Sequence, residues 1–135
     1  MEEFSYIVLD LEWNQPMSGQ EIITRPFRFD SEIIEIGALK LNNRFEEMSE
    51  FKSFVRPVFY PAMNGHVVQL TKIRPQELEK APVFPAAYAA FRDWCGEDCC
   101  LCTWGPDAGA DGQPPDARTG CRPPGWLRPP AHLRP

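Results

Sequence analysis

This sequence has no apolar stretch long enough to cross a membrane, and its N-terminus carries no basic leader. These absences argue against a transmembrane span or a secretory signal, and they predict a cytoplasmic protein whose five cysteines stay reduced. An excess of positive charge is also missing, because the formal net charge is −5. The overall composition therefore does not by itself indicate nucleic-acid binding.

Histidine is scarce, since the chain contains only His66 and His132. Neither stands at zinc spacing from the pair Cys99 and Cys102, and in an extended strand those two cysteines point to opposite faces. We therefore expect no zinc site and interpret Cys99, Cys100 and Cys102 as small buried hydrophobic residues of a strand. His66 is interpreted as a surface-loop or helix-cap residue.

Residues 105–135 lack lysine, isoleucine, valine, phenylalanine, tyrosine and methionine, and they contain eight of the fifteen prolines. Such a segment cannot add to a hydrophobic core, so we predict a folded domain over 1–107 and a disordered tail over 108–135, rich in Pro, Gly, Ala and Arg. Three interpretations of the tail stay open. The first is a frameshifted or unrelated end, the second is a proline-rich ligand for SH3- or WW-type partners, and the third is an ordinary disordered extension.

The residues before the tail have the patterns of a folded α/β domain. Branched aliphatic residues and alternating polarity predict three strands in an antiparallel meander, and a short cysteine-rich run predicts a fourth strand parallel to the first. Two short helices are expected within 61–79, and a longer amphipathic helix over 84–95. The four strands are expected at 5–13, 32–41, 51–57 and 98–104.

Two carboxylates, Asp10 and Glu12, end the first predicted strand. Side chains two apart on a strand point to the same face, about 6.6 Å apart along the chain. Mg²⁺ and Mn²⁺ prefer oxygen ligands, and a pair of such ions can hold the attacking and the leaving oxygen of a phosphoryl displacement. The pair therefore predicts a metal site, with a strand that ends in a polar turn as the alternative.

The segment Tyr6–Glu12 resembles the first motif of the DEDD-type 3′-to-5′ exonucleases, especially their DEDDh branch. Residues 32–38 and 54–57 resemble the next two strands, and Leu70–Ile73 is similar to the family's Leu-Thr-Gly-Ile, with lysine in place of glycine. This resemblance covers Ser5–Asp107. It implies a ribonuclease H-like mixed sheet, with an antiparallel three-strand meander, a parallel strand and flanking helices, truncated at the tail.

The same resemblance implies a metal-dependent 3′-to-5′ exonuclease that hydrolyses phosphodiester bonds at the 3′ end of RNA or single-stranded DNA. Its cofactor would be a pair of Mg²⁺ or Mn²⁺ ions. Asp10 and Glu12 would be the catalytic metal ligands, with Asp107 as a further ligand. Trp13 and Leu70 would form the pocket for the terminal nucleotide, and core packing is the alternative for both.

The family also uses a histidine, followed a few residues later by an aspartate, to activate the attacking water. His66 comes too early for that role, and no aspartate follows His132. We therefore expect this chain to be inactive or crippled as an enzyme. The alternative is a non-catalytic module, a pseudo-exonuclease, that binds a nucleic-acid end or a protein partner. The expected partner is a single-stranded 3′ end, and no membrane is expected.

Overall fold

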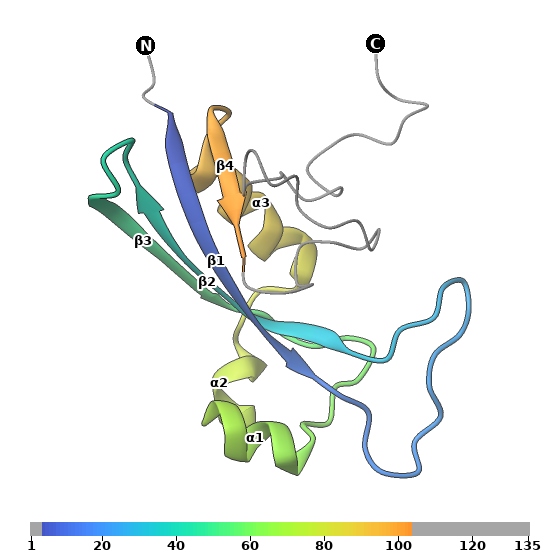
Figure 1. Ribbon diagram of the computed structural model, residues 1–135. Coiled ribbons are helices and arrows are strands. Elements are labelled where there is room, and N and C mark those ends of the chain that lie inside the picture. Colours follow the sequence, from blue (N-terminus) through green and yellow to red (C-terminus); the bar gives the residue numbers. More distant parts are fainter. Residues whose placement is uncertain (1–3, 104–135) are drawn as a thin grey trace. The chain divides into compact units, whose positions relative to one another are not determined.

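The protein is described by a computed structural model that places residues 4–103 (Figure 1). Predictions for the tail over 108–135, for Asp107 and for His132 therefore lie outside the described residues. Within the described part, no helix is both long and apolar enough to span a membrane. The elements are β1 (Ser5–Asn14), β2 (Glu32–Leu41), β3 (Glu47–Phe54), α1 (Gly65–Thr71), α2 (Pro75–Glu79), α3 (Phe84–Cys95) and β4 (Cys99–Cys102).

The strands form one mixed sheet in the order β3-β2-β1-β4 (Figure 1). Strands β1 and β4 pair in parallel, with Ser5 opposite Cys99 and Val8 opposite Cys102. The first three strands follow one another as an antiparallel meander, because adjacent strands joined by a turn or loop reverse direction. This arrangement confirms the predicted ribonuclease H-like α/β class.

Strand β3 differs most from its expected range, since it begins at Glu47 and ends at Phe54 instead of covering 51–57. Its first residues are polar, and most of their side chains are exposed. The strand lies at the end of the sheet order, where its backbone pairs on one side only. An edge strand tolerates charged side chains on both faces. The polar residues at the start of β3 therefore gave no strand pattern in the sequence, although this segment pairs with β2.

The chain divides into two compact units. Within the described residues, the first unit comprises 4–10, 38–51 and 95–103, and the second comprises 11–37 and 52–94. Both units contain parts of several strands, so the division does not follow the element boundaries.

In the first unit, the parallel pair of strands begins where the Ser5 amide donates a hydrogen bond to the Asp98 carbonyl at 3.0 Å. The expectation that all three β4 cysteines are buried was wrong, because Cys99, Cys100 and Cys102 are only half-buried. β4 is a four-residue strand at the end of the sheet order, which leaves its side chains partly accessible. The buried residues of this unit are Ser5, Ile7, Leu9, Ala38, Cys95 and Leu101.

The core of the second unit joins β2 to the two short helices. Apolar side chains from successive elements meet here because each element buries one face. This confirms the two short helices that were predicted within 61–79. The cluster consists of Ile34, Val67, Ile73 and Leu78, with Phe54 and Met63 packed against it.

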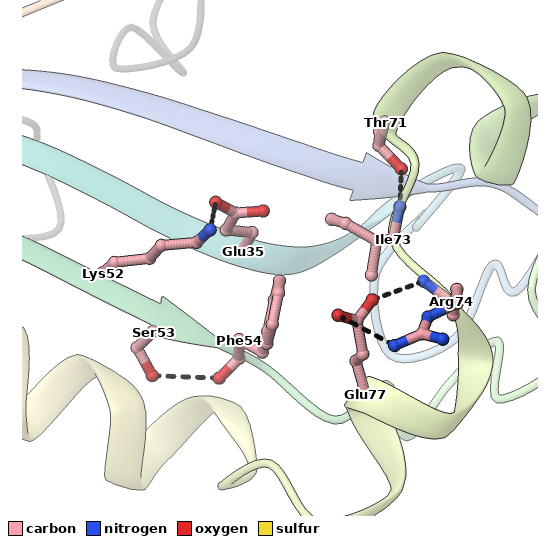
Figure 2. A network of polar contacts seen from close by, with 8 residues as sticks. All are labelled: Glu35, Lys52, Ser53, Phe54, Thr71, Ile73, Arg74 and Glu77. Carbon is pink, nitrogen blue, oxygen red and sulfur yellow. Dashed lines mark hydrogen bonds and ion pairs between the residues drawn. The ribbon is translucent and has the colours of Figure 1, made fainter.

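The junction between α1 and α2 is tightened by Thr71 (Figure 2). Its hydroxyl donates to the Val67 carbonyl at 2.8 Å and accepts from the Ile73 amide at 3.1 Å. Lys72, which lies between Thr71 and Ile73 in the chain, has a left-handed backbone conformation with φ 63° and ψ 11°. That conformation favours glycine. It accounts for glycine at this position of the family's segment, and it means that lysine is strained here.

Two exposed ion pairs lie near the same core (Figure 2). At the start of α2, the Arg74 amide donates to a Glu77 carboxylate oxygen at 2.8 Å, and the guanidinium lies 3.8 Å from the other oxygen. On the sheet, Lys52 Nζ lies 3.7 Å from the Glu35 carboxylate and 5.2 Å from the centre of the Phe54 ring. Such surface pairs stabilise by about 1 kcal/mol at most.

Candidate functional site

Asp10 and Glu12 both lie in β1, where burial alternates along the strand. Leu9 and Leu11 are buried, whereas Asp10 is exposed and Glu12 is half-buried. Because side chains alternate between faces, the two carboxylates belong to the same face of this strand, opposite the two leucines. Their role as metal ligands stays a prediction.

The donor chemistry of this pair suits a hard cation. Within residues 4–103, no group of three or more His, Cys, Asp or Glu side chains is arranged to hold a metal ion. Two carboxylates agree with the way Mg²⁺ is often bound, through one or two protein oxygens with water or substrate phosphates as the other ligands. The proposed further ligand, Asp107, lies outside the described residues.

Asn14, the last residue of β1, was not predicted from the sequence to have a role at the site. Its side chain is fully buried, its amide donates to the carbonyls of Tyr60 (2.8 Å) and Ala62 (3.0 Å), and its oxygen accepts from the Asn64 amide at 3.0 Å. A buried amide with three partners fixes the end of β1 to the segment before α1. No sequence signal distinguished Asn14, because asparagine is common where a strand gives way to a loop.

Asn64 continues this connection into α1. It is the N-cap of the helix, and its side chain accepts from the His66 amide at 2.9 Å and donates to the Pro16 carbonyl at 3.0 Å. His66 is exposed as expected, but it lies within the first turn of α1 instead of in a loop, and the cap of the helix is Asn64.

The two residues predicted to contact the terminal nucleotide both belong to the second unit. Leu70 lies in α1 and is 70% exposed, so the core-packing alternative does not hold for it. Trp13 lies in β1 and is half-buried, which leaves both alternatives open. The Asn64 amide donates to the Asn14 side chain, and the Asn64 side chain accepts from the His66 amide, so these two bonds connect the strand that carries Trp13 to the helix that carries Leu70.

Tyr60 fixes the connection between β1 and β2. It is fully buried, and its hydroxyl donates to the Phe29 carbonyl and accepts from the Ile23 amide. Ile23 and Phe29 also form an antiparallel bridge, in which the Phe29 amide donates to the Ile23 carbonyl at 2.8 Å. One side chain therefore holds both arms of an otherwise irregular segment.

Glu32, at the start of β2, has a structural role. Its carboxylate accepts from the amides of Val58 (2.5 Å), Phe59 (3.0 and 3.1 Å) and Tyr60 (2.8 Å). Charge-assisted bonds of this kind are roughly twice as strong as bonds between neutral groups. The carboxylate is therefore committed to the turn after β3, and Glu32 is not a candidate metal ligand.

Three cysteines of the first unit, Cys95, Cys99 and Cys102, are unsuited to catalysis. Burial, together with a smaller contribution from the nearby Cys99 and against an opposite effect of Lys40, raises the pKa of the Cys95 thiol to about 12. Burial also raises the pKa of Cys99 and of Cys102. A thiol is nucleophilic, or a good metal ligand, only as the thiolate, so these groups are inert at neutral pH.

Comparison with known proteins identifies the family. A family profile described as exonuclease, of the RNase T type, matches residues 7–109. The chain belongs to the exonuclease family. The match begins within β1 and includes all the later described elements of this exonuclease domain. It confirms the resemblance that the Asp-x-Glu motif and the following strands suggested.

Solved structures share the fold of this exonuclease domain. A 3′-exonuclease described as recognising the 3′ end of a histone mRNA stem-loop has a TM-score of 0.64 and 23% identity, over 78% of this chain and 38% of that chain. The nuclease domain of 3′hExo, a DEDDh family member bound to rAMP, has a TM-score of 0.63 and 24% identity, over 77% and 53%. Cell-death related nuclease 4 has a TM-score of 0.58 and 16% identity, over 75% and 35%.

The domain therefore spans about a third to a half of the length of these solved structures. No curated protein sequence matches it significantly.

Proposed function

We propose that this domain carries the first metal-ligand pair of a metal-dependent 3′-to-5′ exonuclease that acts on the 3′ end of RNA or single-stranded DNA. The observation that supports it most is the placement of Asp10 and Glu12 on one face of β1, within a chain whose residues 7–109 match the exonuclease family. A bound Mg²⁺ or Mn²⁺ would polarise a phosphoryl oxygen of the substrate as a Lewis acid.

The chain's own residues would hold the ion and the end of the strand. Asp10 is exposed and Glu12 half-buried on the same face of β1, so both can present an oxygen to a cation. Leu70 offers an exposed apolar side chain against which a terminal base or sugar could pack, and Trp13 is the proposed second contact. Asn14 is a positioning residue, because it fixes the end of β1 without a proposed substrate contact.

The proposal includes weak hydrolysis by these 135 residues. His66 is exposed in the first turn of α1 and precedes the expected histidine motif, and His132 lies outside the described residues. An enzyme without a general base loses on the order of 10² to 10⁴ in rate. If the tail reflects a shifted reading frame, the repaired frame should encode an apolar helix and later a histidine with an aspartate a few residues on.

Binding of Mn²⁺ tests the metal site. Isothermal titration should show Mn²⁺ binding that is lost in the double variant Asp10→Asn, Glu12→Gln. The control is Glu47→Gln, Glu50→Gln, which makes the same change of charge on the edge strand β3 and should leave binding unchanged. Binding that survives the Asp10 and Glu12 changes would rule out this site.

Hydrolysis is tested separately with a 5′-labelled single-stranded oligonucleotide and Mn²⁺. We expect slow shortening from the 3′ end that disappears in Asp10→Asn. Rapid shortening that disappears in the variant would show that hydrolysis by these residues does not need the expected histidine motif. Shortening that persists in the variant would remove Asp10 from the mechanism.

The lack of a third metal ligand within residues 4–103 favours one second candidate, a module that binds a nucleic-acid end without cleaving it. Such a module would bind the oligonucleotide and leave its length unchanged, even at high enzyme concentration with Mn²⁺.

A further inference from the structure

An exposed aromatic cluster lies in the second unit, formed by Phe27, Phe29 and Phe59. The rings of Phe29 and Phe59 are stacked, with centroids 4.9 Å apart and an interplanar angle of 10°. Phe27 meets Phe29 edge to face, at 6.4 Å and 87°. Phe27 is 71% exposed and Phe59 is 50% exposed, so much of both residues is accessible to a ligand.

The backbone beneath this cluster is fixed by the contacts described above. The Tyr60 hydroxyl bonds to Ile23 and Phe29, and the Glu32 carboxylate holds the amides of residues 58–60. If the loop with Phe27 and Phe29 met the loop with Phe59 only through exposed rings, binding a ligand would have to order both loops, and this ordering would cost entropy. These hydrogen bonds reduce that cost, because they hold the rings close together beforehand.

Two arginines flank the cluster along the chain. Arg25 and Arg28 are the only charged residues between Ile22 and Phe29, and both are exposed. Among the described residues, neither guanidinium forms an ion pair with a carboxylate. In a chain of net charge −5, these two exposed arginines adjoin Phe27 and Phe29 in the sequence with no carboxylate between them.

The nearby carboxylates are partly committed elsewhere. Glu32 is bonded to backbone amides, and Asp30 accepts from the Ser31 hydroxyl at 3.5 Å. Glu21 is the remaining acidic residue of the Gln15–Ser31 connection. The formal charges of residues 15–31 cancel, because Glu21 and Asp30 balance Arg25 and Arg28. Since Asp30 already accepts a hydrogen bond from Ser31, the two arginines are more available to an external anion than this balance suggests.

We propose that the aromatic cluster, with Arg25 and Arg28, binds a single-stranded segment of the nucleic acid. Bases stack on aromatic faces largely independently of sequence, and guanidinium groups pair with phosphates and also stack. This inference rests on the proposed function, and it adds a contact for nucleotides other than the terminal one assigned to Trp13 and Leu70. A protein ligand is disfavoured because three rings offer a small apolar area beside two cations.

The test uses the whole 135-residue chain and 5′-fluorescein dT₁₅ and rU₁₅, with EDTA present so that no hydrolysis occurs. Fluorescence anisotropy should show a Kd that rises roughly fivefold or more in Phe27→Ala, the loss expected for one stacked base. Phe45→Ala is the matched control, because Phe45 is 68% exposed and lies in the first unit. It should leave the Kd unchanged.

The arginines are tested by salt dependence. Arg25→Ala, Arg28→Ala should reduce the slope of log Kd against log salt by about 1.4, the value for two phosphate contacts on a single strand. Arg44→Ala, Arg92→Ala makes the same change of net charge at exposed positions outside the cluster. It should keep the slope. Thermal unfolding of each variant verifies that the fold is retained.

Three results would overturn the inference. The first is a Kd for the oligonucleotide that does not change in Phe27→Ala, and the second is an equal rise of this Kd in the two arginine double variants. The third is a chain that binds no oligonucleotide but self-associates, with the self-association abolished in Phe27→Ala. If Mn²⁺ binding needs Asp10 and Glu12 while oligonucleotide binding ignores the cluster, only the inference fails. If oligonucleotide binding needs the cluster while Mn²⁺ binding ignores both carboxylates, only the metal site fails.

Discussion

The two units of this domain are stabilised in different ways. In the first, the parallel pairing of β1 with β4 is accompanied by buried side chains that are mostly small or aliphatic. In the second, fully buried polar side chains, Asn14 and Tyr60, hold irregular segments in place. The difference shows that regular pairing suffices where strands run side by side, whereas the loops around the proposed substrate residues need individual side-chain bonds.

The largest expected loss of stability comes from replacing Asn14, the fully buried asparagine of the second unit. Asn14→Ala leaves the carbonyls of Tyr60 and Ala62 and the amide of Asn64 without their partner. Unsatisfied buried groups cost about 1 to 3 kcal/mol each, and water should rescue some of them. We therefore expect the free energy of unfolding in urea to fall by about 3 kcal/mol.

Asn42→Ala is the matched control in the first unit. The Asn42 side chain accepts from the amides of Arg44 and Glu46 in an exposed turn, where water can replace it. The expected loss is about 0.5 to 1 kcal/mol. Equal losses in the two variants would contradict the distinction between the units.

The second expected effect is a pH dependence in the first unit. Burial raises the pKa of Cys95 from 9.0 to about 12, so the folded state holds its thiol proton more tightly than the unfolded state does. Stability is therefore fully present below pH 9.0 and is lost as the pH rises toward about 12. After a discount for partial solvent screening, the full loss should be on the order of 2 kcal/mol.

The measurement is urea unfolding between pH 8 and about 9.5, where ordinary thiols ionise but most lysines and tyrosines do not. Cys95→Ala should flatten the decline above pH 9.0. An identical decline in the variant would assign the pH dependence to other groups.

The smallest effect is expected at Lys72 in the second unit. Its φ of 63° is left-handed, so Lys72→Gly should relieve backbone strain and raise the free energy of unfolding by about 1 kcal/mol. Lys80→Gly is the control, because Lys80 also follows a helix but has φ −100°. That change should be neutral or destabilising. A gain of stability at both positions would show that left-handed strain is not the cause.

Sequence patterns predicted the elements whose periodicity is strong. β2 and α3 begin and end where expected, and the parallel placement of β4 beside β1 was anticipated from the family order. The start of β3 was missed, because its polar side chains obey the chemistry of an edge strand instead of a buried one.

The candidate site was less predictable than the sheet. The placement of Asp10 and Glu12 on one face of β1 could be predicted because alternation on one strand is a local property, and their role as metal ligands stays a prediction. The bonds of Asn14 to residues 60–64, and of Glu32 to residues 58–60, join positions far apart in the sequence. No local pattern encodes such partners, since each depends on where the loops travel after the strands have paired.

The Tyr60 hydroxyl also changes how the Gln15–Ser31 connection can vary. By bonding to Ile23 and Phe29 it divides one long loop into two shorter ones, and the entropic cost of closing a loop rises only slowly with its length. The turn at Met17–Gln20 lies outside the clamped part, is exposed, and is closed by its own hydrogen bonds. Extra residues inserted in that turn lengthen only the first of the two loops. The domain can therefore accept insertions there while Phe27 and Phe29, in the part of the connection bonded to Tyr60, keep their positions.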